Sequence, residues 1–357
     1  MKMLKYILSV WLLLVATAVS AHGEEGANEA EGEKFNPKEV IFEHLGDEYG
    51  WHVFKWSIPL PVIVCDEEGG WHVFSSARLQ DGGEYEGFYI AEEGDYAHKV
   101  VGRRADGSEY RPWDFSITKN VFALILCALV LCWLIFPLVR WYKRKPMEAP
   151  RRVKGLMETL VDFLYKGVIV SVLGSHAKRY APYLLTLFFF ILIMNLMGLI
   201  VIFPGGANLT GNISITLVLA LCTFVVVNVS GRKHYWKDVF WPEVPLWLKC
   251  PVPMMPVIEF FGVLTKPVSL MIRLFANMLG GHIIVLVLIS LIFIMSALGN
   301  AAMGGTTVIS VAFAVFMNTL HVLISFIQAY VFFMLSTIFI ALAVPEEGGH
   351  EKAKKIK

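Results

Sequence analysis

Apolar residues fall into long, nearly continuous runs over the C-terminal two thirds of the chain, and such runs predict membrane-spanning helices. Residues 115–139, Tyr180–Phe203 and Ile213–Ser230 are each long enough to cross a bilayer once. Two longer segments follow, Pro256–Leu298 and Thr306–Val344, with a glycine-containing turn between them. The second would be roughly 57 Å long as one helix, against a hydrocarbon core of ~30 Å, so we expect a steeply tilted helical hairpin.

Other periodicities mark the rest of the chain. Residues 153–175 alternate charged and apolar positions with helical spacing, which predicts an amphipathic helix along the membrane surface. Upstream, short runs rich in Val, Phe, Trp and Tyr stand between glycine turns, and G-W-H-V-F occurs at both Gly50–Phe54 and Gly70–Phe74. The predicted fold is an all-α polytopic membrane protein with about five crossings, an interfacial helix and a small β-rich N-terminal region.

Charge and targeting signals set the expected orientation. Residues 1–21 combine a basic start, an apolar core and a small-residue site, which is typical of a signal peptide; a true N-terminal span is the alternative. Basic clusters follow the first and third spans and close the chain, so these ends are predicted to be cytoplasmic. We therefore expect a bacterial inner-membrane protein with a signal peptide at 1–21, an exported polar and β-rich region at 22–113, a membrane domain at 114–345 and a basic cytoplasmic tail at 346–357.

Composition excludes several classes of protein. Of 357 residues, 56% are hydrophobic, which rules out an ordinary soluble domain, and a net charge of +1 gives no attraction to nucleic acid. Only Cys65 of the five cysteines lies in the exported part, so no disulfide framework is available. His44, His52 and His72 lack a recognisable ligand spacing, and surface or strand-packing histidines are favoured over a metal site.

Arg273 stands in the otherwise apolar stretch Pro267–Leu298, at membrane depth. A charge there costs at least ~2.5–3.5 kcal/mol on insertion scales, so it needs a partner. Glu259 is the only acidic residue from position 245 to 345, and a continuous helix places it about 21 Å from Arg273. We expect another polypeptide to supply the counter-charge; snorkelling to a headgroup or facing a water-filled cavity are the alternatives.

Polar residues on both long segments recur at helical spacing. Ser269, Arg273 and Asn277 lie four residues apart, and Lys266 lies seven residues before the arginine. The second segment carries Asn318, His321, Ser325 and Gln328. Such stripes can simply join helices by hydrogen bonds. Together with Glu259 and two histidines they favour a proton path, since titratable groups in membranes mark relays and histidine exchanges protons near neutral pH.

The choice of arginine over lysine supports this interpretation. A guanidinium keeps its charge in lipid, whereas a buried lysine can lose its proton. A permanent positive charge drives the proton off a carboxylic acid beside it. Arg273 would thus make an acid carried on a separate, moving subunit release one proton to one side and collect another from the other side.

The motif K-P-V-S-L-x-x-R-L-F-x-N-M at 266–278, with H-x-x-x-x-x-x-Q-A-Y at 321–330, resembles subunit a of the F-type ATP synthase membrane sector. The resemblance covers roughly residues 115–345, including M-N-L-M in the second span and N-I-S-I-T-L-x-L-A at the start of the third. It implies a proton-conducting stator subunit that couples proton flow to ATP synthesis through two offset half-channels. The implied partners are the carboxylates of the rotor-ring subunit c, the peripheral-stalk subunit b, other synthase subunits and the lipid bilayer.

The resemblance also implies residue roles. Arg273 would face the ring carboxylates and separate the half-channels, with Asn277 and Gln328 supporting it. Glu259 would be the acid of the cytoplasmic half-channel, and His282 and His321 would line the outer one. Family members commonly carry one acid and one histidine at that pair, so this outer path lacks a carboxylate or borrows another group. Ser269 is a further candidate, and the other possible path residues are Asn195, Asn318, Ser325 and Lys266.

Two other functions remain as alternatives. An ion-coupled secondary transporter usually shows internal repeats and broken helices, and the membrane part of the sequence shows neither. A structural membrane scaffold gives no reason for a lone arginine in lipid. Phosphate loops, hydrolase motifs and metal-ligand pairs are also missing from the sequence, so we expect no cofactor and no enzymatic activity of the chain by itself.

Overall fold

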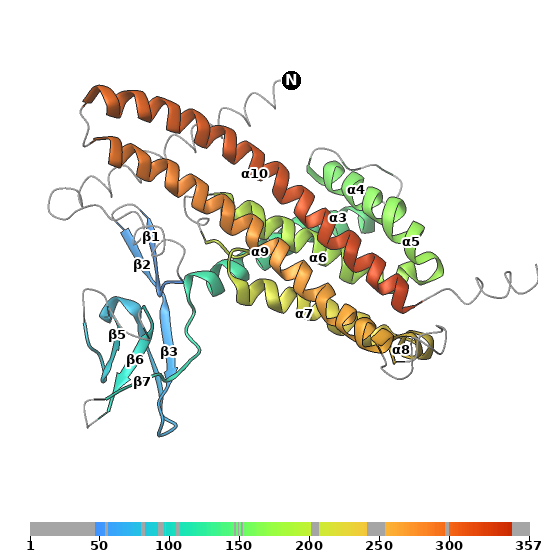
Figure 1. The fold of residues 1–357 in the computed structure, drawn as a ribbon, viewed down its shortest axis with the longest axis horizontal. Coiled ribbons are helices and arrows are strands. Elements are labelled where there is room, and N and C mark those ends of the chain that lie inside the picture. The colour runs from blue at the N-terminus through green and yellow to red at the C-terminus, as the bar shows by residue number, and fades with distance from the viewer. Residues whose placement is uncertain are drawn as a thin grey trace, which may run out of the picture. The chain divides into compact units, whose positions relative to one another are not determined.

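The computed structural model describes residues 47–53, 56–79, 83–91, 96, 98–104, 108–145, 148, 150, 153–200, 207–240, 254–296 and 300–344 (Figure 1). The predicted signal peptide, the predicted basic tail, His44 and Cys250 lie outside these residues. The chain divides into two compact units. One contains the β-rich region and the start of the first long helix, and the other contains most of the membrane helices.

Residues 50–114 form three small antiparallel sheets, as the strand pattern predicted. Four aliphatic side chains and two aromatic rings are buried among them: Val62, Val64, Leu79, Val100, Phe74 and Phe88. The two copies of G-W-H-V-F fall in strands of different sheets. The strands are β1 (Gly50–Val53) with β2 (Trp56–Pro59); β4 (Trp71–Ser75), β3 (Pro61–Cys65) and β8 (Trp113–Asp114) in that order; and β5 (Phe88–Ile90), β6 (Val100–Arg103) and β7 (Glu109–Tyr110).

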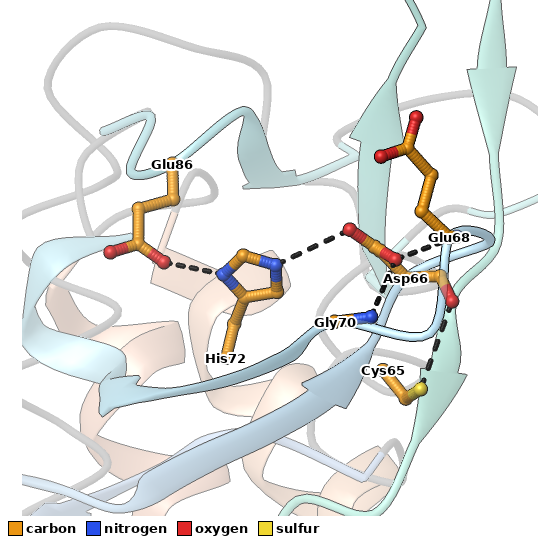
Figure 2. A network of polar contacts seen from close by, with 6 residues as sticks. All are labelled: Cys65, Asp66, Glu68, Gly70, His72 and Glu86. Atoms are coloured by element: carbon orange, nitrogen blue, oxygen red, sulfur yellow. Dashed lines mark hydrogen bonds and ion pairs between the residues drawn. The ribbon is translucent and has the colours of Figure 1, made fainter.

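The acidic glycine turn between β3 and β4 is held by one aspartate (Figure 2). The backbone N–H groups of Glu68 and Gly70 donate to Asp66 Oδ1 at 2.7 and 3.0 Å, and Gly69 adopts a φ of +84° that favours glycine. These N–H groups, Gly70 first, lower the pKa of the Asp66 carboxyl. The sequence Asp-Glu-Glu-Gly-Gly is thus a hairpin connection.

His72 of β4 lies between two carboxylates (Figure 2). Its Nδ1 is 2.6 Å from Glu86 Oε2 and its Nε2 is 3.4 Å from Asp66 Oδ2. The hydrogen bond with Glu86, followed by the one with Asp66, raises the pKa of His72. Among the residues that the structure describes, no group of three or more His, Cys, Asp or Glu side chains is arranged to hold a metal ion.

We expect this contact to depend on pH. Because the pKa of His72 is raised in the folded chain, its stabilising effect is complete below the unfolded value of ~6.5 and is lost as the pH rises through the folded pKa. Proteolytic cleavage of the Asp66–Gly70 turn should therefore be slower at pH 5.5 than at pH 8.5. In the His72→Asn variant, cleavage should be as fast at pH 5.5 as it is at pH 8.5. If this variant is still cleaved more slowly at pH 5.5, as the native chain is, His72 is not the cause of the pH dependence.

The first long helix, α3 (Lys119–Arg144), begins later than the predicted residue 115. The backbone N–H groups of Phe115 and Ile117 still pair with carbonyls of β3, Ile63 O at 2.9 Å and Pro61 O at 3.1 Å. Its first turn is then fixed to the β-rich region, since the Lys119 N–H donates to Glu48 O at 2.9 Å. A hydrophobic run therefore marks the approximate position of a span, while strand pairing decides where the helix starts.

Among the described residues, five helical segments are long and apolar enough to span a membrane, in agreement with the predicted number. The predicted interfacial helix is α4, which runs through a π-helical turn at Tyr165–Val170 and the short α5 to Gly174, whose φ is +51°. The helices after α3 are α4 (Val153–Leu164), α5 (Ser171–Leu173), α6 (Ala177–Leu199), α7 (Ile213–Ser230), α8 (Lys233–Phe240), α9 (Met254–Ser296) and α10 (Asn300–Ala343).

The final hairpin has a shorter connection than predicted. The sequence placed a turn over residues 299–305, but α10 begins at Asn300 and takes Gly304 and Gly305 into the helix. Each helical glycine costs about 1 kcal/mol relative to alanine, which a helix of 44 residues can offset through its other hydrogen bonds and contacts. Five prolines between positions 231 and 256 favour an interfacial loop there, but Lys233–Phe240 of this stretch form the short helix α8, which was not predicted.

Helices α6, α9 and α10 share an aromatic and aliphatic core in the second unit. Phe188 of α6 is fully buried, and its ring centroid lies 5.9 Å from those of both Phe326 and Phe333 of α10. Leu274 of α9 is also fully buried. This core packs α10 against α6 at the C-terminal end of the polar stripe of α10, near Ser325 and Gln328.

Candidate functional site

Helix α9 presents an apolar stripe to the protein and a polar stripe beside it. Leu270, Leu274 and Met278 are buried and follow the four-residue spacing of one helix face. Ser269, Arg273 and Asn277 each precede one of these residues, so they lie about 100° around the helix, and all three are exposed. The packing of α9 therefore turns the polar stripe outward along the edge of its buried face.

The guanidinium of Arg273 forms no ion pair or hydrogen bond with any described residue. Glu259 is half-buried on the same helix, and α9 runs unbroken through both positions. The two charges are thus about 21 Å apart along the axis and do not neutralise each other. Lys266 is closer to Arg273 but has its ammonium 5.5 Å from the centre of the Phe339 ring, a cation–π contact with α10.

Asn277 and Gln328 join the polar stripes of the two long helices. Asn277 Nδ2 donates to Gln328 Oε1 at 2.8 Å. Gln328 is 5% exposed, and its Nε2 has no hydrogen-bond acceptor among the described residues. The amide pair therefore fixes the relative position of α9 and α10 one turn beyond Arg273 while leaving one buried donor available.

The two candidate histidines occupy different environments. His282 of α9 is half-buried, and its Nδ1 lies 3.1 Å from the Met278 carbonyl oxygen. His321 of α10 is 5% exposed and packs on Gly281 of α9. A Cβ at Gly281 would come within 2.2 Å of His321 Nε2, so this position requires glycine unless the imidazole moves. The sequence analysis missed Gly281, because the signal is a contact between helices.

A third polar contact connects α6 to α10. Asn195 Nδ2 donates to the Ser325 backbone carbonyl at 3.3 Å, and both residues are about 1% exposed. Asn195 Oδ1 and Ser325 Oγ have no hydrogen-bond partner among the described residues. Such buried polar atoms are costly in a protein interior, and they mark a place where polar ligands or water would be favoured.

The structure separates the remaining predicted site residues. Glu259 lies near α8, where burial first and then the charge of Glu259 raise the pKa of Tyr235. Asn318 is half-buried on α10, and Ser269 is exposed on α9. Three polar contacts between helices therefore involve predicted site residues: Asn277–Gln328, Gly281–His321 and Asn195–Ser325.

Comparison with known proteins identifies the family of the chain. The family described as ATP synthase A chain matches residues 121–341, which include nearly the whole of the described spanning helices and every residue of the three pairs. The chain belongs to the ATP synthase A chain family. A second match, to a domain of unknown function, covers residues 40–115 and therefore the β-rich region.

Curated relatives of the ATP synthase A chain family extend over the same part of the chain. An ATP synthase subunit a of Chloroherpeton thalassium is 38% identical over 248 residues, covering 68% of this chain and 70% of the relative. One of Chlorobium phaeobacteroides is 41% identical over 250 residues, 67% of this chain and 69% of the relative. One of Myxococcus xanthus is 39% identical over 247 residues, 67% of this chain and 76% of the relative. The resemblance found in the sequence is thus confirmed.

Proposed function

We propose that the chain is the proton-conducting stator subunit of a rotary ATP synthase and that Arg273 separates two offset half-channels. The observation that carries the proposal is an exposed arginine on a membrane-spanning helix that has no counter-charge among the described residues. The chain is not an enzyme by itself, and ATP is made elsewhere in the complex. Its partners are the ring of subunit c, the peripheral-stalk subunit b and the lipid bilayer.

The chemistry of arginine supports this role. A guanidinium remains protonated even in a low-dielectric environment, so it neither donates a proton nor passes one along. An opposite charge within ~4–6 Å favours the ionised form of a carboxylic acid. A ring carboxyl that arrives beside Arg273 therefore loses its proton before it passes, and direct proton transfer between the half-channels is blocked.

The other polar residues divide between the two sides of Arg273. Glu259 serves the cytoplasmic half-channel, with Lys266 and Ser269 between it and the arginine in sequence. His282 and His321 serve the outer half-channel, to which Asn318 also belongs. Asn195, Ser325 and Gln328 carry buried polar atoms without partners among the described residues, which supports a hydrated route where the family commonly has a carboxylate.

Replacing either histidine should slow proton flux and change its dependence on pH. His321→Ala removes a buried imidazole, and we expect the larger effect there, about tenfold or more, because general acid–base groups typically contribute 10²–10⁴-fold. His282→Ala removes a half-buried imidazole, so its effect on proton flux should be smaller. Proton flux through the complex in vesicles, measured from pH 6 to 9, checks both; unaltered flux and pH profile in both variants remove the histidines from the path.

Cysteine cross-linking tests which polypeptide covers the Arg273 face. Ile272 is an exposed apolar neighbour of Arg273, and Val218 of α7 is exposed to a similar degree on another helix. We expect Ile272→Cys, but not Val218→Cys, to cross-link to a small membrane subunit with a cysteine placed beside its essential carboxylate. Equal yields at both positions, or a product at Val218 alone, would falsify the proposed face.

A further inference from the structure

One outer face of the β-rich region is apolar where water would normally favour polar side chains. The sheet β4-β3-β8 buries Val62, Val64 and Phe74 on its inner face. Register places the outward positions in rows across the sheet, since Cys65 pairs with both Trp71 and Trp113, and Ile63 pairs with Val73. The outer sheet face therefore consists of Trp71, Cys65 and Trp113 in one row, Val73, Ile63 and Phe115 in the next, and Ser75, Pro61 and Ile117 in the third.

The large side chains of this outer sheet face are strongly exposed. Trp71 is 63% exposed, Val73 67%, Trp113 73% and Phe115 57%, and the rings of Trp71 and Phe115 lie 5.5 Å apart. An antiparallel sheet with one face on a core usually alternates apolar and polar residues. Here both faces are apolar, and contiguous exposed apolar patches of this kind mark interaction sites.

The sheet β5-β6-β7 provides a contrast within the same region. The outward residues of β5-β6-β7 include Tyr89, Arg103 and Glu109. The Arg103 guanidinium lies 5.0 Å from the centre of the Tyr89 ring, and the Tyr89 hydroxyl donates to Glu109 Oε1. These charged and hydrogen-bonded groups are typical of a water-facing sheet, whereas the described residues of the outer sheet face of β4-β3-β8 carry no charged side chain.

Connectivity brings the apolar face to the membrane. Phe115 precedes the first residue of α3 by four positions, at most ~14 Å of extended chain, and Lys119, Asn120 and Phe122 at the helix start contact the β-rich region. Lys119 N donates to Glu48 O, Asn120 N to Asp47 Oδ1, and the Trp51 and Phe122 rings lie 5.6 Å apart. Exposed apolar residues continue from Val121 and Ile125 along α3. The outer sheet face is thus joined by a short connection to a candidate membrane span.

We propose that the outer sheet face docks on the membrane surface, with Trp71 and Trp113 in the headgroup layer of the outer leaflet. Tryptophan is enriched at membrane–water interfaces because its ring is apolar and its N–H is polar. The interfacial layer is only ~7 Å thick on each side, so the row of Trp71 and Trp113 reaches lipid only if the sheet lies along the bilayer. If the sheet instead stood perpendicular to the bilayer, only the row of Pro61 and Ile117 would lie close to the lipid.

Photo-cross-linking in the assembled complex tests the proposal. Benzoyl-phenylalanine replaces Trp113, Trp71 or, as the control on the sheet β5-β6-β7, Tyr89. Each complex is then reconstituted in phosphatidylethanolamine–phosphatidylglycerol vesicles. We expect phospholipid adducts at Trp113 and Trp71 in about tenfold higher yield than at Tyr89, as for aromatic residues at an interface. Adducts with another polypeptide at Trp113 and Trp71 assign the patch to a subunit interface and overturn the proposal.

Fluorescence of the complex without unnatural residues provides an independent measurement. Brominated phospholipids should quench tryptophan emission, and the Trp71→Phe/Trp113→Phe double variant, which keeps both positions aromatic, should lose the corresponding part of the quenching. Unchanged quenching in the double variant, or equal lipid adducts at Trp113 and Tyr89, shows that the face is in water. Proton pumping is expected to be native in this variant, so this test is separate from that of the proton path.

Discussion

Arg273→Ala is expected to reduce ATP-driven proton pumping to below about 1% of the native rate, because no other permanent charge stands at this position on the two long helices. Arg273 is exposed and makes no side-chain contact by hydrogen bond or ion pair within the described residues. Its removal therefore costs little folding energy, and the complex should still assemble. Pumping is measured by the quenching of a pH-sensitive dye in inverted membrane vesicles.

Two variants accompany this experiment. Ile272→Ala shortens the exposed neighbouring side chain and should leave pumping close to native. Arg273→Lys keeps a positive charge but replaces the permanent guanidinium with an ammonium that can lose its proton in lipid, so pumping should remain strongly impaired. Native pumping in Arg273→Ala, with normal assembly, contradicts the assigned role.

Gly281→Ala is expected to lower proton flux about as much as loss of the His321 imidazole. The added methyl group would lie 2.2 Å from His321 Nε2, so the buried imidazole must move or the two helices must separate. Overpacking of this kind typically costs 1–3 kcal/mol. We expect proton flux to fall about tenfold, as for loss of the imidazole itself, and the rate is measured in the same vesicles.

The adjacent glycine provides a matched control. A Cβ at Gly280 meets no atom within 4 Å, so Gly280→Ala should keep near-native flux and gain helix propensity. A second control combines Gly281→Ala with His321→Ala, in which the space left by the imidazole accepts the methyl group. The double variant should then behave like His321→Ala alone; if flux falls equally in Gly280→Ala and Gly281→Ala, the contact between Gly281 and His321 is not the cause.

Hydrophobic periodicity was sufficient to predict most of the membrane architecture. Helix α7 spans Ile213–Ser230 as predicted, where Asn212 accepts the Ser214 N–H as an N-cap. Boundaries were wrong where other contacts decide them. Phe115 and Ile117 remain paired with β3 and delay α3, and the glycines at 304 and 305 entered α10. Local sequence signals do not include the strand pairing and long helical packing that override them.

The candidate site was predictable along each helix but not between helices. The four-residue spacing of Ser269, Arg273 and Asn277 correctly placed them on one face of α9. The family resemblance implied that Asn277 and Gln328 both support Arg273, but neither their mutual hydrogen bond nor the contact of Gly281 with His321 was predicted. A single sequence gives the angular position of a residue on its helix, whereas the register between two helices depends on how their side chains interlock.

A cryo-EM map of the assembled complex would show whether Arg273 acts on acids carried by another subunit. We expect the Arg273 guanidinium to face the rotor ring, with a ring carboxylate within about 4–6 Å, the range in which an opposite charge ionises an acid. A map in which a carboxylate of the same chain pairs with Arg273, or in which the guanidinium points into lipid with no ring beside it, would rule this role out.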